Sequence, residues 1–108
     1  MTVDRFDVIQ RRTTPSGSDG THDGEDLWVI LSPPEMNAHF DQVLAAPLSP
    51  AEANLPTRIL CRIDSQERTI LLDQLTSLPR TEVGESVSTL PWPTQNNILS
   101  ILQEMFAR

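Results

Sequence analysis

The sequence predicts a mainly β fold, a compact and partly open barrel of five or six short strands that ends in one helix. Two observations predict it. Short apolar segments, either alternating with polar residues or running continuously, recur along the chain between clusters of glycine, proline and acidic residues. A helical spacing of apolar residues is convincing only near the C-terminus. We therefore expect strands to build the core and the terminal helix to cover it.

The N-terminal third predicts two strands separated by a long loop. Residues 5–10 alternate between polar and apolar side chains, which places Phe6 and Val8 on one face of a strand. Residues 11–26 contain three glycines, one proline and no aliphatic residue, so they cannot bury surface and should form a loop. Residues 27–31 are a continuous β-prone run that ends before two prolines, as expected of a central strand covered on both faces.

The middle of the chain predicts further strands and a hairpin. Residues 57–63 alternate strictly, so that Ile59, Cys61 and Ile63 should face the core. The other expected elements are a helical turn over 35–40, a strand over 41–46, a connector with a short helical stretch over 47–56, a polar turn over 64–67, its antiparallel partner strand over 68–73 and a last strand over 81–90.

The C-terminal segment predicts a helix over about residues 94–107. Thr94 is a suitable N-cap, and Pro91 and Pro93 should keep the helix from starting earlier. Its apolar residues follow the i, i+3, i+4, i+7 spacing and are Ile98, Leu99, Ile101, Leu102, Met105 and Phe106.

Length and composition predict one domain over residues 1–108, in a cytoplasmic setting. The chain has 108 residues, 38% of them hydrophobic, and a domain of this size buries roughly 65% of its unfolded surface. The only cysteine, Cys61, cannot form an internal disulfide, and no export signal stands at the start. No apolar run approaches the roughly 20 residues that a membrane span needs. We expect no membrane association.

The charge balance disfavours a simple nucleic-acid binder. Fifteen acidic residues oppose eight arginines and no lysine, for a net charge of −7. Because affinity for a polyanion comes largely from cations that displace counterions from phosphates, RNA or DNA binding would need local clusters of arginine.

Three groups of residues are candidates for chemistry. The acidic loop around His22 contains possible metal ligands, but its spacing fits no calcium loop and a solvated acidic loop is the favoured interpretation, so we expect no metal and no cofactor. Arg58, Arg62 and Arg68 lie on facing strands and predict either a basic strip, joined by Arg11 and Arg12 from the start of the loop, or cross-strand ion pairs with Glu67 and Asp64. Asp73, followed by Gln74, comes at a strand end, where a carboxylate can act as a base, bind a partner or simply cap the strand.

Taken in order, the motifs resemble the MazF/PemK toxin family, and also the related CcdB toxins. They are RFDVIQ, His22-Asp23-Gly24, LWVILSP followed by Asn37, APLS, ILLDQLTSLPR followed by Gly84, VSTL, and a terminal helix ending in MF. The resemblance covers nearly the whole chain, although each motif is short.

The resemblance implies a small SH3-like β-barrel of the CcdB/MazF type, with five to seven strands and a C-terminal helix. It implies the toxin of a type II toxin–antitoxin module, a growth inhibitor and homodimer neutralised by a cognate antitoxin whose flexible tail lies on the toxin. The family activity is metal-independent cleavage of single-stranded mRNA (mRNA interferase). The alternative is a non-enzymatic, CcdB-like inhibitor of DNA gyrase or another protein, although the CcdB-like terminus Phe-Trp-Gly-Ile here reads Phe106-Ala107-Arg108.

Carried over residue by residue, the resemblance implies a ribonuclease site with fewer cations. Asp26 stands where the ribonucleases carry an arginine that stabilises charge on the scissile phosphate, and Leu71 and Thr76 replace two further cationic positions. Ser49 keeps the hydroxyl of the family's Pro-x-Thr motif. In the implied mechanism Asp73 is the base, His22 or an arginine of the Arg58 strand is the acid, and Ser49 orients the phosphate. The implied substrate-binding residues are Arg58, Arg62, Arg68 and Gln74.

Overall fold

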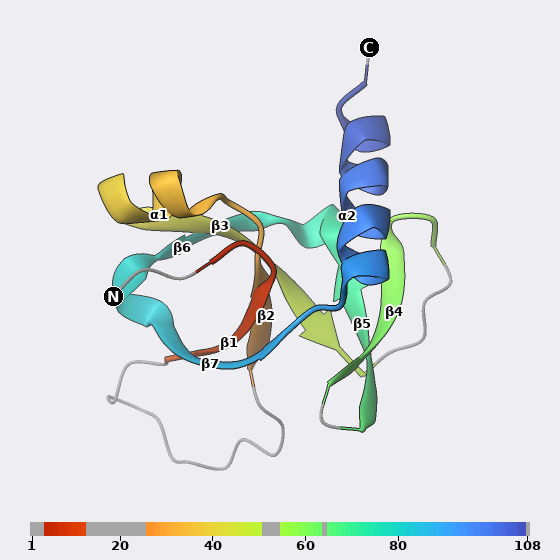
Figure 1. Cartoon of the computed structure of the whole chain (residues 1–108), viewed down its shortest axis with the longest axis horizontal. Coiled ribbons are helices and arrows are strands. Elements are labelled where there is room, and N and C mark those ends of the chain that lie inside the picture. The colour runs from red at the N-terminus through yellow and green to blue at the C-terminus, as the bar shows by residue number, and fades with distance from the viewer. Residues whose placement is uncertain (1–3, 13–25, 51–54, 64, 108) are drawn as a thin grey trace.

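Two antiparallel sheets that share one strand make up the fold (Figure 1). The structure is a computed structural model and describes residues 4–12, 26–50, 55–63 and 65–107. Its elements are β1 (Asp7–Arg11), β2 (Leu27–Ile30), α1 (Pro34–His39), β3 (Gln42–Ser49), β4 (Arg58–Ile63), β5 (Gln66–Leu71), the 3-10 helix η1 (Leu72–Gln74), β6 (Thr76–Pro79), the 3-10 helix η2 (Arg80–Glu82), β7 (Val83–Thr89) and α2 (Trp92–Met105).

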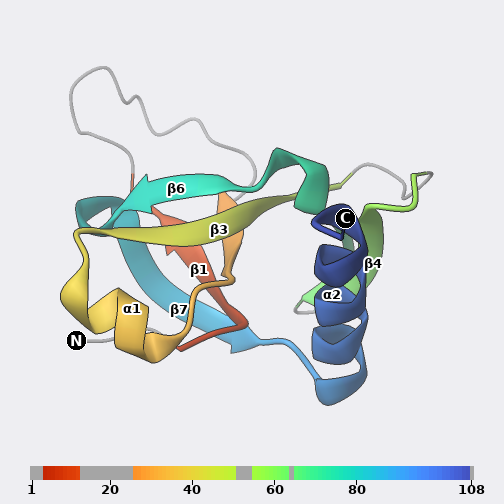
Figure 2. The ribbon, with the colours of Figure 1, turned by 90° about the horizontal axis from the view of Figure 1, so that it is seen from above.

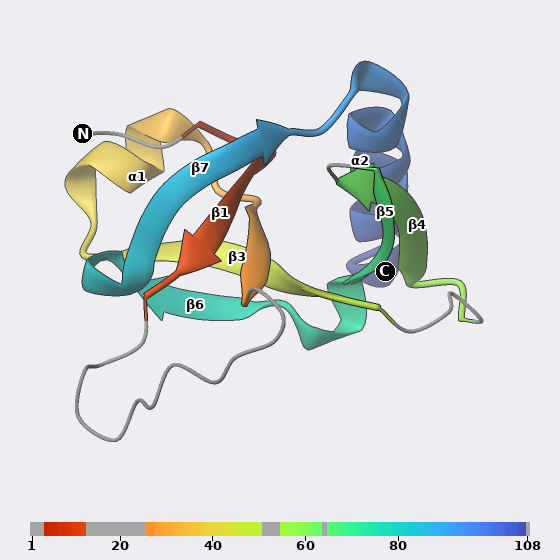
Figure 3. The same ribbon diagram turned by 90° about the horizontal axis from the view of Figure 1, so that it is seen from below.

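Strand β3 belongs to both sheets. Its first half pairs with β6, and its last two residues, Leu48 and Ser49, pair with β5. The larger sheet has the order β7-β1-β2-β3-β6, and the smaller one has the order β3-β5-β4. These orders end at β7 and β6 in the larger sheet and at β4 in the smaller one, so the barrel is open (Figure 3). The expected mainly β, partly open barrel with a terminal helix is therefore confirmed.

The expected connector over 47–56 is wrong in its first part, because β3 continues to Ser49. Pro47 sits opposite Trp28 of β2, at the point where the other edge of β3 changes from β6 to β5. Its missing N–H therefore falls in the gap between two partner strands, where a proline costs no ladder hydrogen bond. The remainder of this connector lies partly outside the described residues.

Strand β6 was not expected, and the neighbouring boundaries differ from the sequence prediction. Residues Thr76–Pro79 pair with the first half of β3. The strand expected over 68–73 ends at Leu71, since Asp73 and Gln74 lie in η1. The last strand begins at Val83 rather than 81 because η2 precedes it.

Helix α2 begins at Trp92, two residues before the expected start. Pro91 is its N-cap residue and Pro93 lies in its first turn. The first amides of a helix have no acceptor within the helix, so a proline there loses nothing and its fixed φ favours the helical conformation. Thr94 is therefore inside the first turn and not the cap.

The core consists of two groups of apolar side chains. The larger one lies between the two sheets and α2, where Ile98 is fully buried and Cys61 faces inward as predicted. The smaller group is made of Ile9, Trp28, Ile30, Val43, Ala45 and Leu78. Figure 2 shows α1 at one end of the molecule and α2 with β4 at the other.

Strand β7 lies close against β1 and joins the two ends of the chain. Asp7 is paired with Thr89, whose hydroxyl donates to the Asp7 carboxylate at 2.9 Å. At Gly84 a Cβ atom would overlap the carbonyl oxygen of Gln10, so the approach of the two strands requires glycine.

Candidate functional site

The hairpin of β4 and β5 positions most of the predicted site residues. Arg58 begins β4 and is opposite Leu71, so Asp73, which follows in η1, returns beside it. Ser49 ends β3, and Gln74 is exposed at the end of η1. His22 lies outside the described residues.

Arg58 and Asp73 form a two-point ion pair. The Arg58 Nε donates to Asp73 Oδ1 and Nη2 donates to Oδ2, each at 3.2 Å, and the Thr57 hydroxyl donates to Oδ1 at 3.1 Å. Both side chains remain partly accessible, Arg58 at 23% and Asp73 at 32%. The arrangement fixes a carboxylate and a guanidinium together at an accessible position.

The pair shifts both titrations toward the charged forms. The hydrogen bond from Arg58 is the main cause that lowers the pKa of Asp73, with a smaller contribution from Thr57 and partial opposition from desolvation. The hydrogen bond to Asp73 raises the pKa of Arg58. Asp73 is therefore an ionised carboxylate at neutral pH, able to accept a proton but a weaker base than an isolated carboxylate.

Ser49 lies on the same small sheet as Arg58, with strand β5 between them. It is opposite Thr69 of β5, which in turn is opposite Leu60 of β4. From strand spacings the Cα atoms of Ser49 and Arg58 are separated by roughly 12 Å. The two residues can therefore contact successive parts of one extended ligand, with β5 between them.

The predicted basic strip is wrong for Arg68, and also for Arg11, which is paired with Glu82 and Asp26 at the end of β1. Opposite residues in an antiparallel pair point to the same face, and Arg68 is opposite Cys61 while Arg58 and Arg62 alternate onto the other face. Burial raises the pKa of the Cys61 thiol to about 11, and the charge of Arg68 opposes this shift. Both the expected turn over 64–67 and the observed turn, after which β5 starts at Gln66, place Arg68 opposite an inward-facing residue of β4, so the error was to assume that arginines on facing strands share a face.

Arg62 shows the alternative arrangement that the sequence left open. Its Nη2 lies 3.9 Å from Glu67 Oε2, and both side chains are about two-thirds exposed. Exposed pairs of this kind contribute roughly 0–1 kcal/mol to stability, so Arg62 is available to exchange its partner for a ligand.

Asp26 is held by Trp28 and Arg11, a cluster that the sequence reasoning missed. The indole N–H of Trp28 donates to Asp26 Oδ1 at 2.9 Å, and Arg11 Nη1 lies 3.8 Å from Oδ2. The same guanidinium donates to Glu82 Oε1 at 2.8 Å and stacks 5.5 Å from the centre of the Trp28 ring. Two carboxylates thus surround one cation, and the cluster carries a net negative charge. Arg11 preceding the acidic loop was the available signal, but its partner Glu82 is 71 residues away.

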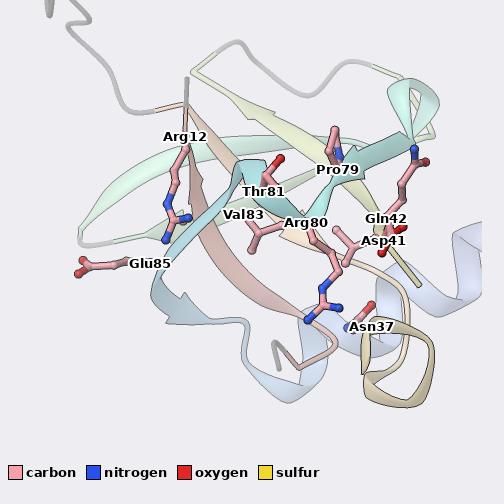
Figure 4. Close-up of a pocket in the computed structure, with 11 residues that line it drawn as sticks. Arg12, Asn37, Asp41, Gln42, Pro79, Arg80, Thr81, Val83 and Glu85 are labelled. Atoms are coloured by element: carbon pink, nitrogen blue, oxygen red, sulfur yellow. The ribbon is translucent and has the colours of Figure 1, made fainter. Parts of the chain in front are cut away.

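A cavity of about 660 Å³ lies at the other end of the molecule, beside α1 and the turn between β6 and β7 (Figure 4). It was also missed, because its lining comes from four separate segments. The residues are Arg12, Asn37, Asp41, Gln42, Val43, Pro79, Arg80, Thr81, Val83, Gly84 and Glu85.

Two further properties concern metals and membranes. Within residues 4–12, 26–50, 55–63 and 65–107, no three His, Cys, Asp or Glu side chains are grouped closely enough to hold a metal ion. The acidic loop around His22 is outside these ranges. Neither helix in the described part of the chain has the length and apolar composition of a membrane span.

Several solved structures share this architecture. An endoribonuclease from mycobacterial species superposes with a TM-score of 0.75 at 21% identity, over 96% of this chain and 90% of that one. A mycobacterial endoribonuclease in complex with its cognate antitoxin gives a TM-score of 0.75 at 22% identity, over 94% of this chain and 92% of that one. The MazE–MazF structure (Form-II) from Deinococcus radiodurans gives a TM-score of 0.79 at 16% identity, over 99% of this chain and 97% of that one. At these identities the likeness establishes the fold.

The sequence itself places the chain in a family. The model of the PemK-like, MazF-like toxin of type II toxin–antitoxin systems matches residues 4–106. This protein therefore belongs to the PemK/MazF toxin family. A search of curated proteins finds no significant match.

Proposed function

We propose that this toxin is an endoribonuclease that cleaves single-stranded RNA, using the 2′-hydroxyl of the substrate as nucleophile. The observation that carries the proposal is the Arg58–Asp73 pair, an ionised carboxylate and a guanidinium fixed side by side and open to solvent. Two solved structures with this fold are endoribonucleases, which supports it.

In the proposed reaction the 2′-oxygen attacks the adjacent phosphorus, and the bond from phosphorus to the 5′-oxygen breaks. Asp73 accepts the proton of the 2′-hydroxyl, and the leaving 5′-oxygen takes a proton from an acid, either His22 or an arginine of β4. The products are a 2′,3′-cyclic phosphate and a 5′-hydroxyl. Arg58 provides charge for the phosphate, while Ser49 orients the strand.

In this proposal Arg58 must supply most of the positive charge that stabilises the phosphate during cleavage. Asp26 occupies the position implied for the family's arginine, and the nearest cation, Arg11, is already paired with two carboxylates. Arg62 and Gln74 are further proposed contacts for the RNA. Because Arg68 faces the other side of the hairpin, it would act only through the position of the strands.

We also propose a homodimer that assembles through α2. Trp92, Leu99 and Phe106 are spaced by seven residues, so they lie on one side of the helix, and they are 70%, 42% and 69% exposed. Such a stripe of large apolar side chains is typical of an interface, and a second copy presents the same stripe.

The cognate antitoxin is the other proposed partner. Relatives with this fold have been solved with an antitoxin bound. We propose that a flexible antitoxin tail covers the Arg58–Asp73 region, where it would exclude RNA.

The test is cleavage of single-stranded RNAs of varied sequence by the purified protein and its Asp73→Asn variant. Glu35→Gln, which removes an exposed carboxylate on α1, is the matched control. We expect cleavage by the wild type and the control, and a loss of roughly 100-fold or more in Asp73→Asn. An absence of cleavage across all RNAs would contradict the proposal. Inhibition of gyrase supercoiling with intact RNA would favour the alternative, which the net charge of −7 also suits.

A further inference from the structure

Two arginines without side-chain partners line the same cavity. Seven of the eight arginines fall within the described residues, and five of them bind a carboxylate, an amide or a carbonyl oxygen through their side chains. In this part of the chain Arg12 and Arg80 are the two with no side-chain hydrogen bond or ion pair. Both border the 660 Å³ cavity.

The backbone holds both arginines in place. The amide of Arg12 donates to the carbonyl of Glu82 at 2.7 Å, and the amide of Arg80 donates to the carbonyl of Asp41 at 2.8 Å. Their guanidiniums remain exposed. Figure 4 shows the Arg80 side chain directed toward Asn37 and the Glu85 carboxylate pointing away from the other labelled side chains. The arginines are thus anchored at their backbone and open at their charged ends.

The floor of the cavity is rigid. Asn37 is 1% exposed, its amide donates to the Ser32 carbonyl at 3.0 Å, and the Ser32 hydroxyl donates to Asn37 Oδ1 at 2.5 Å. The amide of Leu44 then donates to the same hydroxyl oxygen at 3.1 Å. Val43, on the cavity wall, is 2% exposed and belongs to the smaller core group. A ligand would therefore meet a preformed surface.

The lining combines two guanidiniums and two carboxylates, those of Asp41 and Glu85, with hydrogen-bonding groups and an apolar wall. Gln42 and Thr81 contribute an amide and a hydroxyl, and Val43, Pro79 and Val83 contribute apolar surface. The volume is within the range of small-ligand sites. A guanidinium is well suited to a phosphate because its planar fork donates two parallel hydrogen bonds. An inorganic anion would leave the apolar wall unused, whereas a nucleotide would use both.

We infer that this cavity binds a ribonucleotide, with its phosphate on one of the two arginines, Arg12 or Arg80, and its sugar or base against the apolar wall and the other arginine. The bound ribonucleotide is either a free mononucleotide or one residue of a single-stranded RNA. The cavity is distinct from the Arg58–Asp73 pair: Gln42 and Ser49 lie at opposite ends of β3, a separation of roughly 23 Å. The inference goes beyond the proposed cleavage and does not require it.

Calorimetric binding to the intact protein tests the inference. The probes are a ribonucleoside 5′-monophosphate, a short RNA with 2′-O-methyl groups that cannot be cleaved, inorganic phosphate and an Asp- and Glu-rich peptide. The variants are Arg12→Gln, Arg80→Gln and both together. Arg5→Gln is the matched control, because Arg5 and Arg12 flank opposite ends of β1 and the change removes the same charge.

We expect the wild type and Arg5→Gln to bind the monophosphate or the RNA, with each cavity variant roughly 10-fold weaker. Binding of the monophosphate identifies a free nucleotide as sufficient, and binding of the RNA alone identifies the strand. For the RNA, each cavity substitution should also lower the salt dependence by about one counterion. Four outcomes would each overturn the inference. Neither the monophosphate nor the RNA binds, inorganic phosphate binds as tightly as the monophosphate, the acidic peptide binds more tightly than both, or Arg5→Gln weakens binding as much as the cavity variants do. Thermal unfolding verifies that the exposed substitutions leave the fold intact. RNA cleavage is measured in a separate assay, so that a lack of cleavage is not confused with a lack of binding at the cavity.

Discussion

Arg58 and Asp73 tie the start of β4 to the short helix η1 through two contacts of 3.2 Å each. Because the pair lowers the pKa of Asp73, the folded state binds this proton less readily than the unfolded state does. The stabilisation is present above the ordinary carboxyl pKa near 4 and is lost as the pH falls through the lowered pKa of the folded state. The free-energy difference between the wild type and Asp73→Asn should therefore shrink on acidification below about pH 4. Urea unfolding of both proteins at pH 7 and at successively lower pH measures this difference. A difference that grows on acidification would contradict the lowered pKa of Asp73.

Arg58→Lys separates charge from geometry at the same pair. Lysine keeps the positive charge but cannot make the two parallel contacts with the Asp73 carboxylate. We expect RNA cleavage to fall at least about 10-fold while the protein stays folded. Single-turnover rates give the comparison, with Glu35→Gln as the control. Unchanged cleavage would show that charge alone is needed.

Asp26→Asn should strengthen RNA binding. The substitution removes one of the two carboxylates around Arg11 and leaves an amide oxygen that can still accept the hydrogen bond from Trp28. Since Asp26 and Arg11 are both partly exposed, we expect a gain of only a few-fold. Filter binding of non-cleavable RNA at low salt measures it. Weaker binding would mean that the Asp26 charge itself helps to position Arg11.

Leu99→Glu should disrupt the proposed dimer. It introduces a charge in the middle of the apolar stripe on α2, where a second copy would have to desolvate it. Asn97→Glu places the same charge elsewhere on the helix surface, at an exposed position off the stripe. Sedimentation should show monomers for Leu99→Glu and dimers for the wild type and Asn97→Glu. A monomeric wild type would contradict the proposed assembly.

Gly84→Ala should destabilise the fold by roughly 1–3 kcal/mol. The added methyl group would overlap the carbonyl oxygen of Gln10, and this neighbour is backbone in a paired strand, so β7 must shift. Ser86→Ala, on the exposed side of the same strand, is the control and should change stability by less than about 0.5 kcal/mol. Thermal unfolding of the three proteins provides the measurement.

The parts of the fold that the sequence predicted are those governed by local periodicity. Alternation placed Ile59, Cys61 and Ile63 in the core, and the helical spacing placed Ile98 there. Two of the errors involve prolines, whose effect depends on position. Pro47 sits between two partner strands and Pro93 in a first helical turn, and in both places a proline costs little.

The candidate site was less accessible to sequence reasoning, because it depends on pairing between distant segments. Asp73 was a candidate from the sequence, at the end of a strand, but it lies in η1, and its ion pair with Arg58 follows from the register of the hairpin. Arg68 is opposite Cys61, so the pairing places it on the inward face of the hairpin and not on the face of Arg58 and Arg62. The cavity with Arg12 and Arg80 gathers residues from separate segments, so local spacing contains no signal for it.

The pairing of β1 with β7 also has a consequence for synthesis of the toxin. Asp7 and Thr89 are partners across 82 residues, so the larger sheet cannot be completed until nearly the whole chain has left the ribosome. Long-range strand pairing of this kind is slow because loop closure must precede the contacts that reward it. A nascent chain would therefore present an unfinished sheet while it is being made. An antitoxin synthesised at the same time could then accumulate before the toxin has folded.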